Sequence, residues 1–307
     1  MNNSLHSVLM IRPSCFRRNS ETASNNYFQN QILNINEDKI LKNAILEFDN
    51  LVSKIKECGI DVHVYQDDLK QDTPDSVYPN NWITFHSKQR IALYPMYAKN
   101  RRLERNEEVL QFLKEKNIII NESIDYSSAE KKECFLEGTG SMVLDRINKK
   151  SYCSISERTN ENLVYEFCND FEYMPIIFNS FQNHQNKRKP IYHTNVMMCI
   201  AKNYCVICLD AIDDKMEREK VIRSLKDDNK EIINISEKQL NLFAGNMIEL
   251  IKDNKSFLFM SKTAYNSLNK NQLEKLVSHS NLINSSVSTI EKCGGGSVRC
   301  MIAEIFN

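Results

Sequence analysis

Short runs of β-forming residues recur along this chain from one end to the other, and segments with helical spacing separate many of them. The runs are about three to eight residues long and are bounded by polar residues, Pro or Gly. The predicted strands are Val8–Ile11, Val62–Tyr65, Ile91–Tyr94, Ile118–Ile120, Met142–Leu144, Val196–Ala201, Cys205–Leu209, Glu231–Ile235, Phe257–Met260 and Val298–Ile305. The predicted helices are Lys39–Cys58, Leu103–Glu115, Glu161–Phe171, Asp214–Lys226 and Lys270–His279. Because strands outnumber helices and often follow one another directly, the sequence predicts an α/β fold with mixed strand pairing.

The order of these elements is roughly strand, strand, helix, strand, and it repeats along the chain. Repetition of one supersecondary unit is typical of propeller-like architectures. No linker rich in Pro, Gly or Ser divides the sequence, so residues 1–307 are predicted to form a single domain. The polar stretch Asn179–Arg188 is predicted to be an exposed loop.

Charge and cysteine usage exclude several classes of function. Forty basic residues balance forty acidic ones, so no net field favours nucleic acid or an anionic membrane. No segment has the roughly 20 apolar residues of a membrane helix, and no signal peptide is present, so a cytoplasmic protein is expected. The ten cysteines are then expected to be reduced. Cys205 and Cys208 form a CxxC motif within a predicted buried strand, and no second pair or His cluster accompanies it, so no metal site is predicted.

Three of the seven glycines in the chain are consecutive, at Gly294–Gly296, and Cys300 follows them. A glycine run marks a sharp turn or backbone that must approach another group closely. A thiol beside such a turn can be partly exposed and surrounded by backbone N–H groups, which favours the nucleophilic thiolate. The alternative is a small residue that begins a buried strand. A phosphate-binding loop is disfavoured, because no Lys-Ser/Thr pair and no helix follow.

Two other segments carry candidate catalytic groups. Glu137 is followed closely by Gly138 and Gly140, so its carboxylate could be held near a substrate amine or cation; the alternative is an ordinary turn. His193 precedes a strongly apolar run and could be a general acid and base, or a satisfied histidine at a strand end. With Cys300, these residues supply a nucleophile, a proton carrier and an orienting carboxylate. A serine triad is not supported, because no Gly-x-Ser-x-Gly motif occurs.

These motifs resemble the pentein superfamily of guanidino-modifying enzymes, which contains arginine deiminases, dimethylarginine hydrolases and amidinotransferases. Further blocks are similar to the citrulline-utilisation hydrolase branch, often called arginine-deiminase-related. The blocks, which span nearly the whole chain, are Ile11–Pro13, Thr22–Ala23, Asn25–Gln29, Asp75–Trp82, Leu93–Arg102, Phe243–Met247 and Gly294–Phe306. The resemblance implies a pentein α/β propeller of about five ββαβ units with pseudo-fivefold symmetry and a central active site.

The resemblance also implies roles for individual residues. Cys300 matches the family's nucleophile, His193 its general acid and base, and Glu137 the carboxylate that steadies the imidazolium. The residues implied to bind substrate are Asn25, Phe28, Asn81, Asn195, Arg158 and one of Arg101 and Arg102. The arginines lie about twenty residues after Asn81 and Glu137, and a bidentate contact with the α-carboxylate explains such positions.

Two departures from the arginine-processing pattern bear on the substrate. Asn81 and Asn195 stand where those relatives often have Asp. An amide offers both a donor and an acceptor, which suits a neutral ureido group better than a guanidinium. The prediction is therefore a cofactor-free hydrolase of a free amino acid that converts citrulline to ornithine, ammonia and carbon dioxide. The alternative purely structural role of both asparagines stays open.

Other functions also stay open at this point. The rival activities are arginine deiminase, dimethylarginine hydrolase and amidinotransferase. A catalytically silent binding protein is disfavoured, because a binder needs no nucleophile. The sequence does not fix homo-oligomer formation.

Overall fold

The computed structural model describes residues 5–29 and 36–306, and these residues form a series of short sheets. Five of the sheets have three strands each. In order across each sheet they are β17–β1–β2 (Ala303–Phe306, Leu5–Arg12, Asp61–Gln66), β3–β4–β5 (Ile83–His86, Arg90–Leu93, Glu122–Asp125), β6–β7–β8 (Met142–Asp145, Lys150–Ser154, Met174–Phe178), β11–β12–β13 (Met198–Ile200, Tyr204–Ile207, Glu231–Asn234) and β14–β15–β16 (Ile248–Lys252, Lys255–Ser261, Asn281–Ser285).

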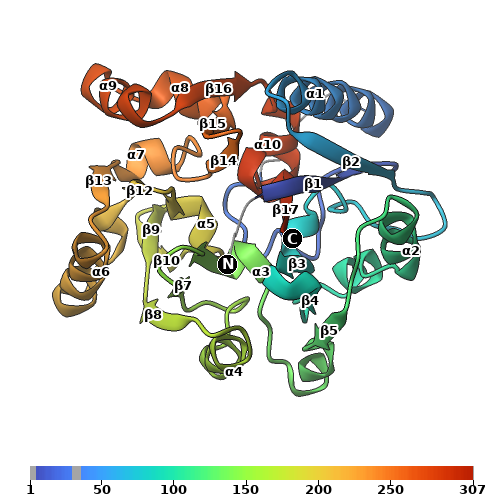
Figure 1. Cartoon of the computed structure of the whole chain (residues 1–307), viewed down its shortest axis with the longest axis horizontal. Helices are drawn as coiled ribbons and strands as arrows, with labels where there is room; N and C mark the ends of the chain where they lie inside the picture. Colours follow the sequence, from blue (N-terminus) through green and yellow to red (C-terminus); the bar gives the residue numbers. More distant parts are fainter. Residues whose placement is uncertain (1–4, 30–35, 307) are drawn as a thin grey trace.

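The five sheets share one connectivity. The middle strand pairs antiparallel with the first strand and parallel with the third, and a helical crossover joins the parallel pair. The crossover helices are α1 (Glu37–Glu57), α2 (Glu107–Glu115), α4 (Glu161–Phe171), α6 (Lys215–Asp227), α8 (Lys262–Ser267) and α9 (Lys270–His279). These helices lie around the outside of the molecule (Figure 1). The predicted mixed α/β class is confirmed. The sheets stay separate in the described part of the chain, and the fivefold propeller remains a prediction.

Short helical segments also connect the strands. They are α3 (Gly138–Ser141), α5 (Thr194–Met197), α7 (Glu237–Leu240), α10 (Ser288–Gly294) and the 3₁₀ turns η1 (Pro79–Asn81), η2 (Ser87–Gln89), η3 (Asn100–Glu104), η4 (Ser127–Lys132), η5 (Leu209–Ala211) and η6 (Val298–Met301). Three of them, α3, α5 and α10, lie towards the middle of the molecule (Figure 1). We call the first strand of each sheet order given above (β17, β3, β6, β11 and β14) its inner strand. Two of the short segments, α3 and α5, lead directly into inner strands β6 and β11. Residues beside α3 and α5 are therefore held at the ends of inner strands.

The long helices form where their sequence favours them. In α1 one face carries buried apolar side chains, including Phe48 and Leu51, and the Asn36 side chain caps the first turn by accepting from the Lys39 N–H. Asparagine side chains cap α2, α4 and α9 in the same way, through Asn106, Asn160 and Asn269. Predicted helices Glu161–Phe171 and Lys270–His279 have the observed bounds.

Three predicted strands differ from the structure. Ile118–Ile120 is not a strand, and β5 begins only at Glu122. Val196–Ala201 begins inside α5, and only Met198–Ile200 is extended. Val298–Ile305 begins as the 3₁₀ turn η6 before β17. Short apolar runs have no periodicity that separates strand from helix, which explains these errors.

The predicted loop Asn179–Arg188 is largely a hairpin of β9 (Phe181–His184) and β10 (Lys187–Pro190). Its two-residue turn consists of Gln185 and Asn186, which have φ values of 50° and 61°. Two consecutive positive φ values match the twist of a hairpin, and Asn tolerates this conformation better than most residues. The polar composition of the strands concealed this hairpin from sequence analysis.

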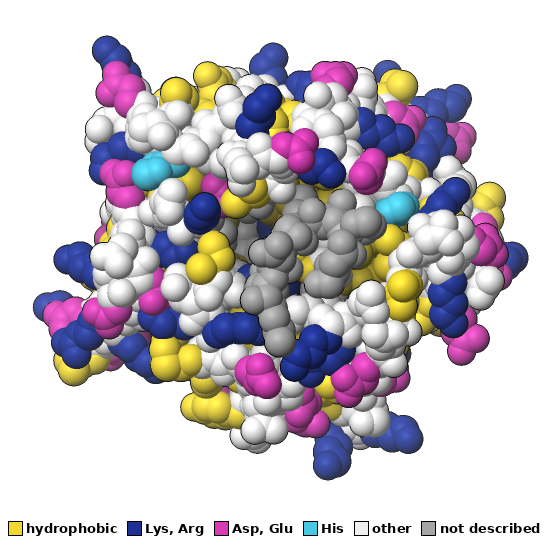
Figure 2. Space-filling model, in the orientation of Figure 1, with side chains coloured by type: hydrophobic (Ala, Val, Ile, Leu, Met, Phe, Trp, Pro, Cys, Tyr) yellow, Lys and Arg dark blue, Asp and Glu magenta, His cyan; other side chains and the backbone are white. Residues whose placement is uncertain are grey.

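Hydrophobic side chains from several sheets share continuous clusters. The largest cluster extends from Tyr152 on β7 through Val206 on β12 to Leu258 on β15. Trp82, the only tryptophan, is fully buried in another cluster with Leu9 of β1. On the face in Figure 2, acidic and basic side chains are interspersed. Within the described ranges, no helix is both long enough and apolar enough to cross a membrane.

A buried ion pair joins two neighbouring sheets. The Lys230 Nζ lies 2.9 Å from Asp145 Oδ2 and also donates to the carbonyls of Ala201 and Lys202, and both charged side chains are almost fully buried. Burying a charge without a partner is costly, so the pair depends on both members.

We expect Asp145→Asn to lower the free energy of unfolding by about 3–5 kcal/mol, because the Lys230 charge stays buried without its partner. Adding Lys230→Met to this variant removes the unpaired charge and restores much of the loss. Urea denaturation of the wild type, the single variant and the double variant measures both effects. Equal stability of all three proteins would contradict the expectation.

Candidate active site

Glu137 and His193 form a buried pair between two sheets. Each residue directly precedes a one-turn helix, Glu137 before α3 and His193 before α5. The His193 Nε2 lies 2.8 Å from Glu137 Oε2, and the side chains are 2% and 0% exposed. Glu137 Oε1 accepts from the Tyr97 N–H at 3.0 Å. Both carboxylate oxygens are therefore held, and they fix the orientation of the imidazole.

The glycines after Glu137 allow this close packing. Gly138 has a φ of 46°, and a Cβ there would collide with the Asn80 carbonyl oxygen. A Cβ on Gly140 would lie 2.5 Å from Asn81 Nδ2 and 2.7 Å from His193 Nδ1. Asn81 and His193 thus pack so closely against Gly140 that no larger residue fits there without moving them.

Two buried arginines set the charge states of the pair. Nη1 of Arg158 and Nη1 of Arg101 lie 3.5 and 3.7 Å from Glu137 Oε2. Burial alone would raise the pKa of Glu137, but Arg158, the His193 hydrogen bond and Arg101 together lower it. For His193, burial outweighs the effect of Glu137 and lowers the pKa to about 4. At neutral pH the imidazole is therefore uncharged, donates from Nε2 to the ionised Glu137, and keeps Nδ1 as a proton acceptor.

Cys300 lies in the 3₁₀ turn η6 and is 3% exposed. The sequence predicted a partly exposed thiol, so this degree of burial is a correction. Its Sγ has two amide nitrogens nearby, Nδ2 of Asn246 at 3.3 Å and Nδ2 of Asn195 at 3.6 Å. Directed donors favour the nucleophilic thiolate, whereas burial by itself disfavours it.

The glycine run before Cys300 allows aromatic side chains to approach the backbone. A Cβ on Gly294 would collide with the Tyr78 hydroxyl, which donates to the Ile290 carbonyl at 3.2 Å. Gly295 has a φ of 67°, and its carbonyl accepts from the Tyr192 hydroxyl at 2.6 Å. The predicted need for close backbone approach at this run is met.

A small cavity joins these groups. Its lining residues are Thr22, Asn26, Asp75, Tyr78, Asn81, Arg101, Arg158, Tyr192, His193, Gly294, Gly296 and Cys300. The volume of about 10 Å³ is roughly the space for one water molecule. An amino acid can enter only if surrounding side chains move.

The two lining arginines are held by the protein and keep some donor capacity. Arg101 Nε and Nη2 donate to the Glu104 carboxylate, each at 2.9 Å, and Nη1 donates to Asn81 Oδ1 at 2.8 Å. Arg158 donates from Nε and Nη2 to Asn25 Oδ1, from Nη2 to the Thr22 carbonyl at 3.1 Å and from Nη1 to Glu137 Oε2 at 3.5 Å. Each guanidinium has five N–H donors, so these contacts leave an Nη1 N–H of each for a further acceptor.

Other residues predicted to bind substrate lie elsewhere. Arg102 turns away from the cavity and donates to the Met96 carbonyl at 3.0 Å, so of the two neighbouring arginines only Arg101 reaches the cavity. The Phe28 ring packs on Phe243 with a centroid distance of 5.3 Å and does not line the cavity. Asn25 contacts Arg158, and Asn195 contacts the sulfur of Cys300.

Sequence analysis missed Asp75, which lines the cavity and is 2% exposed. Its Oδ2 accepts from Asn19 and Thr22, whereas Oδ1 has no hydrogen-bond partner among the described residues. Burial raises the pKa of Asp75 despite the nearby charge of Arg101. Asp75 was within a block quoted for the resemblance, but an Asp before a Ser looks like a surface turn.

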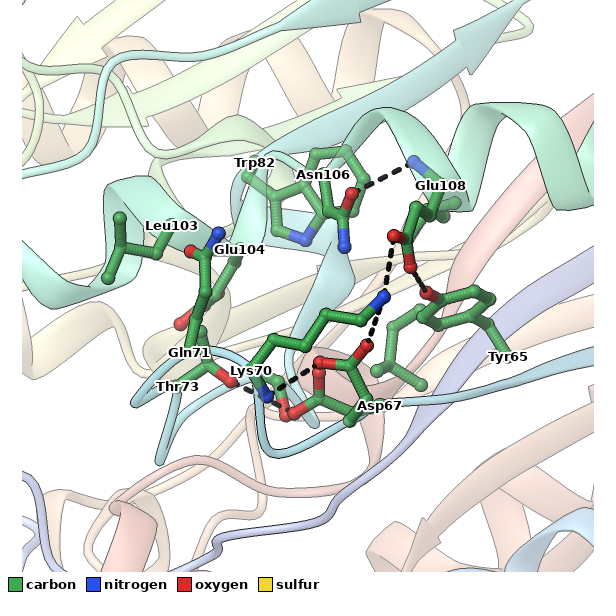
Figure 3. Close-up of a pocket in the computed structure, with 14 residues that line it drawn as sticks. Tyr65, Asp67, Lys70, Gln71, Thr73, Trp82, Leu103, Glu104, Asn106 and Glu108 are labelled. Carbon is green, nitrogen blue, oxygen red and sulfur yellow. Dashed lines mark hydrogen bonds and ion pairs between the residues drawn. The ribbon is translucent and has the colours of Figure 1, made fainter.

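A larger cavity of about 80 Å³ lies on the other side of the Arg101–Glu104 pair, between β2, η3 and α2 (Figure 3). Lys70 pairs there with Glu108 at 2.8 Å and with Asp68 at 3.1 Å. Because these exposed charges satisfy one another, we place the reactive site at Cys300 and not here.

The sequence profile of a family described as N,N dimethylarginine dimethylhydrolase, eukaryotic, matches residues 12–307. The chain belongs to this family. It therefore falls among hydrolases that act on C–N bonds, and the predicted membership of the pentein superfamily is confirmed. A search of the curated proteins found no match.

Solved structures share the fold at low sequence identity. The substrate-bound N-terminal domain of ArgZ, an arginine dihydrolase from the ornithine-ammonia cycle in cyanobacteria, is 16% identical, with a TM-score of 0.75 and 98% of each chain covered. A variant of AgrE in complex with L-arginine is 16% identical, with a TM-score of 0.74 over 98% of this chain. An adduct of dimethylarginine dimethylaminohydrolase with S-methyl-L-thiocitrulline is 12% identical, with a TM-score of 0.64, and covers 98% of this chain and 100% of that one. The chain spans 40% of the length of the longer ArgZ and AgrE chains.

We expect the wild type to lose more free energy of unfolding than His193→Asn as the pH falls from about 6.5 to about 4. Burial lowers the pKa of His193 to about 4, so in this range the unfolded wild type binds a proton that the folded protein does not. The variant lacks this group. Urea unfolding of both proteins at several pH values measures the difference, and a constant difference would show that the folded imidazole titrates normally.

Proposed function

We propose that this chain is a cysteine hydrolase that cleaves a guanidino C–N bond of a free amino acid of the arginine class. The observation that carries the proposal is the convergence of Cys300, a neutral His193 and two buried arginines on one cavity. Membership of the dimethylarginine hydrolase family supports it, as does the fold shared with ArgZ, an arginine dihydrolase. Arginine and its methylated forms are therefore the first substrates to test.

The cavity offers matching partners for the two ends of an α-amino acid. The remaining Nη1 donors of Arg101 and Arg158 bind the α-carboxylate, and the unpartnered Oδ1 of Asp75 accepts from the α-ammonium group. Both charges of the amino acid would otherwise lose their hydration in a closed site without compensation. The side chain then extends towards Cys300.

The proposed reaction has two steps. His193 first accepts the proton of the Cys300 thiol. The thiolate then attacks the guanidino carbon, and as the C–N bond breaks His193 passes this proton to the departing nitrogen. The resulting thiouronium is attacked by water, which gives its proton back to His193, and cleavage of the C–S bond releases the ureido product and the thiolate. Glu137 stabilises the imidazolium that forms in each step while His193 holds the proton, and at the end of the second step this proton returns to the Cys300 sulfur. The protein groups supply all of this chemistry without a metal or organic cofactor.

Citrulline is a second candidate substrate, and the neutral amide of Asn81 at the cavity favours it. The same two steps on the ureido carbon pass through an S-carbamoyl intermediate and release carbamate, which decomposes to ammonia and carbon dioxide. An assay with arginine, dimethylarginine, citrulline and agmatine, followed by mass spectrometry, tests both candidates. Agmatine lacks the α-carboxylate and is expected to react poorly, because the remaining Nη1 donors of Arg101 and Arg158 then have no carboxylate to bind.

We further propose that residues 1–307 form one catalytic domain in which the five three-stranded sheets surround the cavity as a fivefold propeller. Their common connectivity and the position of the cavity residues beside inner strands support this arrangement. All ten cysteines are free, which supports a reducing compartment such as the cytoplasm.

Cys300→Ala is expected to abolish turnover while the melting temperature changes little. Cys293→Ala is a matched control, because Cys293 is also buried beside the glycine run but burial raises its pKa to about 11. This control is expected to keep wild-type turnover. Steady-state assays and thermal melts of both variants decide the matter. Activity in Cys300→Ala, or its loss in Cys293→Ala alone, would assign the nucleophile elsewhere.

Asn81→Asp is expected to raise the ratio of kcat/KM for arginine over citrulline by about tenfold or more, because a new negative charge favours a cation over a neutral group. The change keeps the acceptor for Arg101, so the fold should tolerate it. Competition assays with both substrates give the ratio directly. An unchanged ratio would show that Asn81 does not lie near the reacting group.

A further inference from the structure

The loop Phe243–Met247 lies between α7 and β14 and has no part in the reaction proposed above. It nevertheless brings a fully buried side chain, Asn246, to the proposed nucleophile. Asn246 Nδ2 lies 3.3 Å from Cys300 Sγ and is closer to it than Asn195 Nδ2, at 3.6 Å. The contact joins residues that are 54 positions apart in the sequence.

Backbone contacts fix the orientation of the Asn246 amide. Its Oδ1 accepts from the Arg299 N–H at 3.1 Å, and its Nδ2 donates to the Asn195 carbonyl at 2.9 Å. Rotating the amide by half a turn would place N–H groups against the Arg299 N–H, and two donors cannot satisfy each other. The amide group has two N–H bonds, so the second one remains for the sulfur.

The rest of the loop is shaped to bring Asn246 this close. A Cβ on Gly245 would collide with the Val196 carbonyl oxygen and would lie 2.6 Å from the Met197 carbonyl carbon. The loop is thus pressed against α5, which also carries Asn195. Phe243 has a φ of 62°, and its ring packs on Phe28. Phe28 therefore supports this loop instead of lining the cavity.

We propose that Asn246 is a positioning residue that holds Cys300 Sγ through a fixed N–H donor and stabilises its thiolate form. The proposal rests on the role of Cys300 in the proposed function. Donors directed at a thiolate favour the charged form, because they replace the water that burial removes. The same donor is useful twice, since the sulfur is a thiolate before attack and becomes one again when the C–S bond breaks.

Alkylation by iodoacetamide without any substrate tests the proposal. The rate at Cys300 is followed by peptide mass mapping across neutral and mildly alkaline pH, with the partly exposed Cys15, Cys58 and Cys134 as internal references. In Asn246→Asp the rate at Cys300 at neutral pH is expected to fall about tenfold to a hundredfold, the usual worth of a hydrogen bond to a charged group. The reference cysteines should react at unchanged rates.

Further variants separate positioning from a merely structural role. Asn246→Ser keeps a shorter donor and is expected to react at a rate between those of the wild type and Asn246→Ala. A merely structural asparagine would loosen the site when replaced, and the buried Cys300 would then react faster. Equal rates in the Ser, Ala and Asp variants, or faster alkylation in any of them, would overturn the proposal.

Asn269→Asp is the matched control, because Asn269 caps α9 with its side-chain oxygen, which Asp also provides. It should leave alkylation and turnover unchanged. Where a substrate is turned over, Asn246→Asp is expected to lower kcat by about tenfold or more and to leave KM within about twofold. The two proposals can fail separately. If the protein hydrolyses no guanidino compound but Cys300 alkylation still depends on Asn246, the proposed function is wrong and the role of Asn246 stands.

Discussion

The buried charge of Glu137 is the constraint on which the rest of this site depends. A carboxylate with no solvent contact needs partners, and here it has the His193 imidazole, the Tyr97 N–H and the guanidinium groups of Arg101 and Arg158. Arg101 has further counter-charges in Glu104 and Asp75. Burial raises the pKa of Glu104 to about 7, so this supporting carboxylate is on the verge of accepting a proton near neutral pH. Citrulline has no net charge and would leave the charge balance of the site intact, whereas arginine and its methylated forms would add one positive charge.

The repeated unit explains how such a group can be assembled from distant parts of the chain. In four of the five sheets the inner strand, β3, β6, β11 or β17, follows a segment of a single turn at once or after one residue, and a turn this short leaves little freedom to the residue beside it. Glu137 and His193 occupy equivalent positions before α3 and α5, on two successive sheets. The sheets therefore set the positions of Glu137 and His193, whereas loops between elements supply other groups of the site, such as Asp75 and Asn246.

The sequence predicts much of the fold, and its failures have common physical causes. Helices with one apolar face, such as Glu161–Phe171, are visible in sequence because their spacing reflects burial. The strand Glu122–Asp125 is not, because it is a mostly exposed edge strand of its sheet and has no apolar run. In the site, glycines and a histidine indicated Cys300, Glu137 and His193. Sequence alone could not choose between Arg101 and Arg102 or identify Asp75, because tertiary contacts alone decide which neighbouring side chain faces a cavity.

The sheet β17–β1–β2 joins strands from opposite ends of the chain, with Leu9 opposite Ala303. Cys300 lies immediately before β17, so its position is set by a pairing that spans nearly the whole sequence. Contacts of this kind form late, because closing a long loop costs entropy before the pairing repays it. During synthesis, the Glu137–His193 pair can therefore assemble well before the thiol reaches it. A partly made chain would contain a formed acid–base pair without a nucleophile, and reactivity would appear only once the last strand is in place.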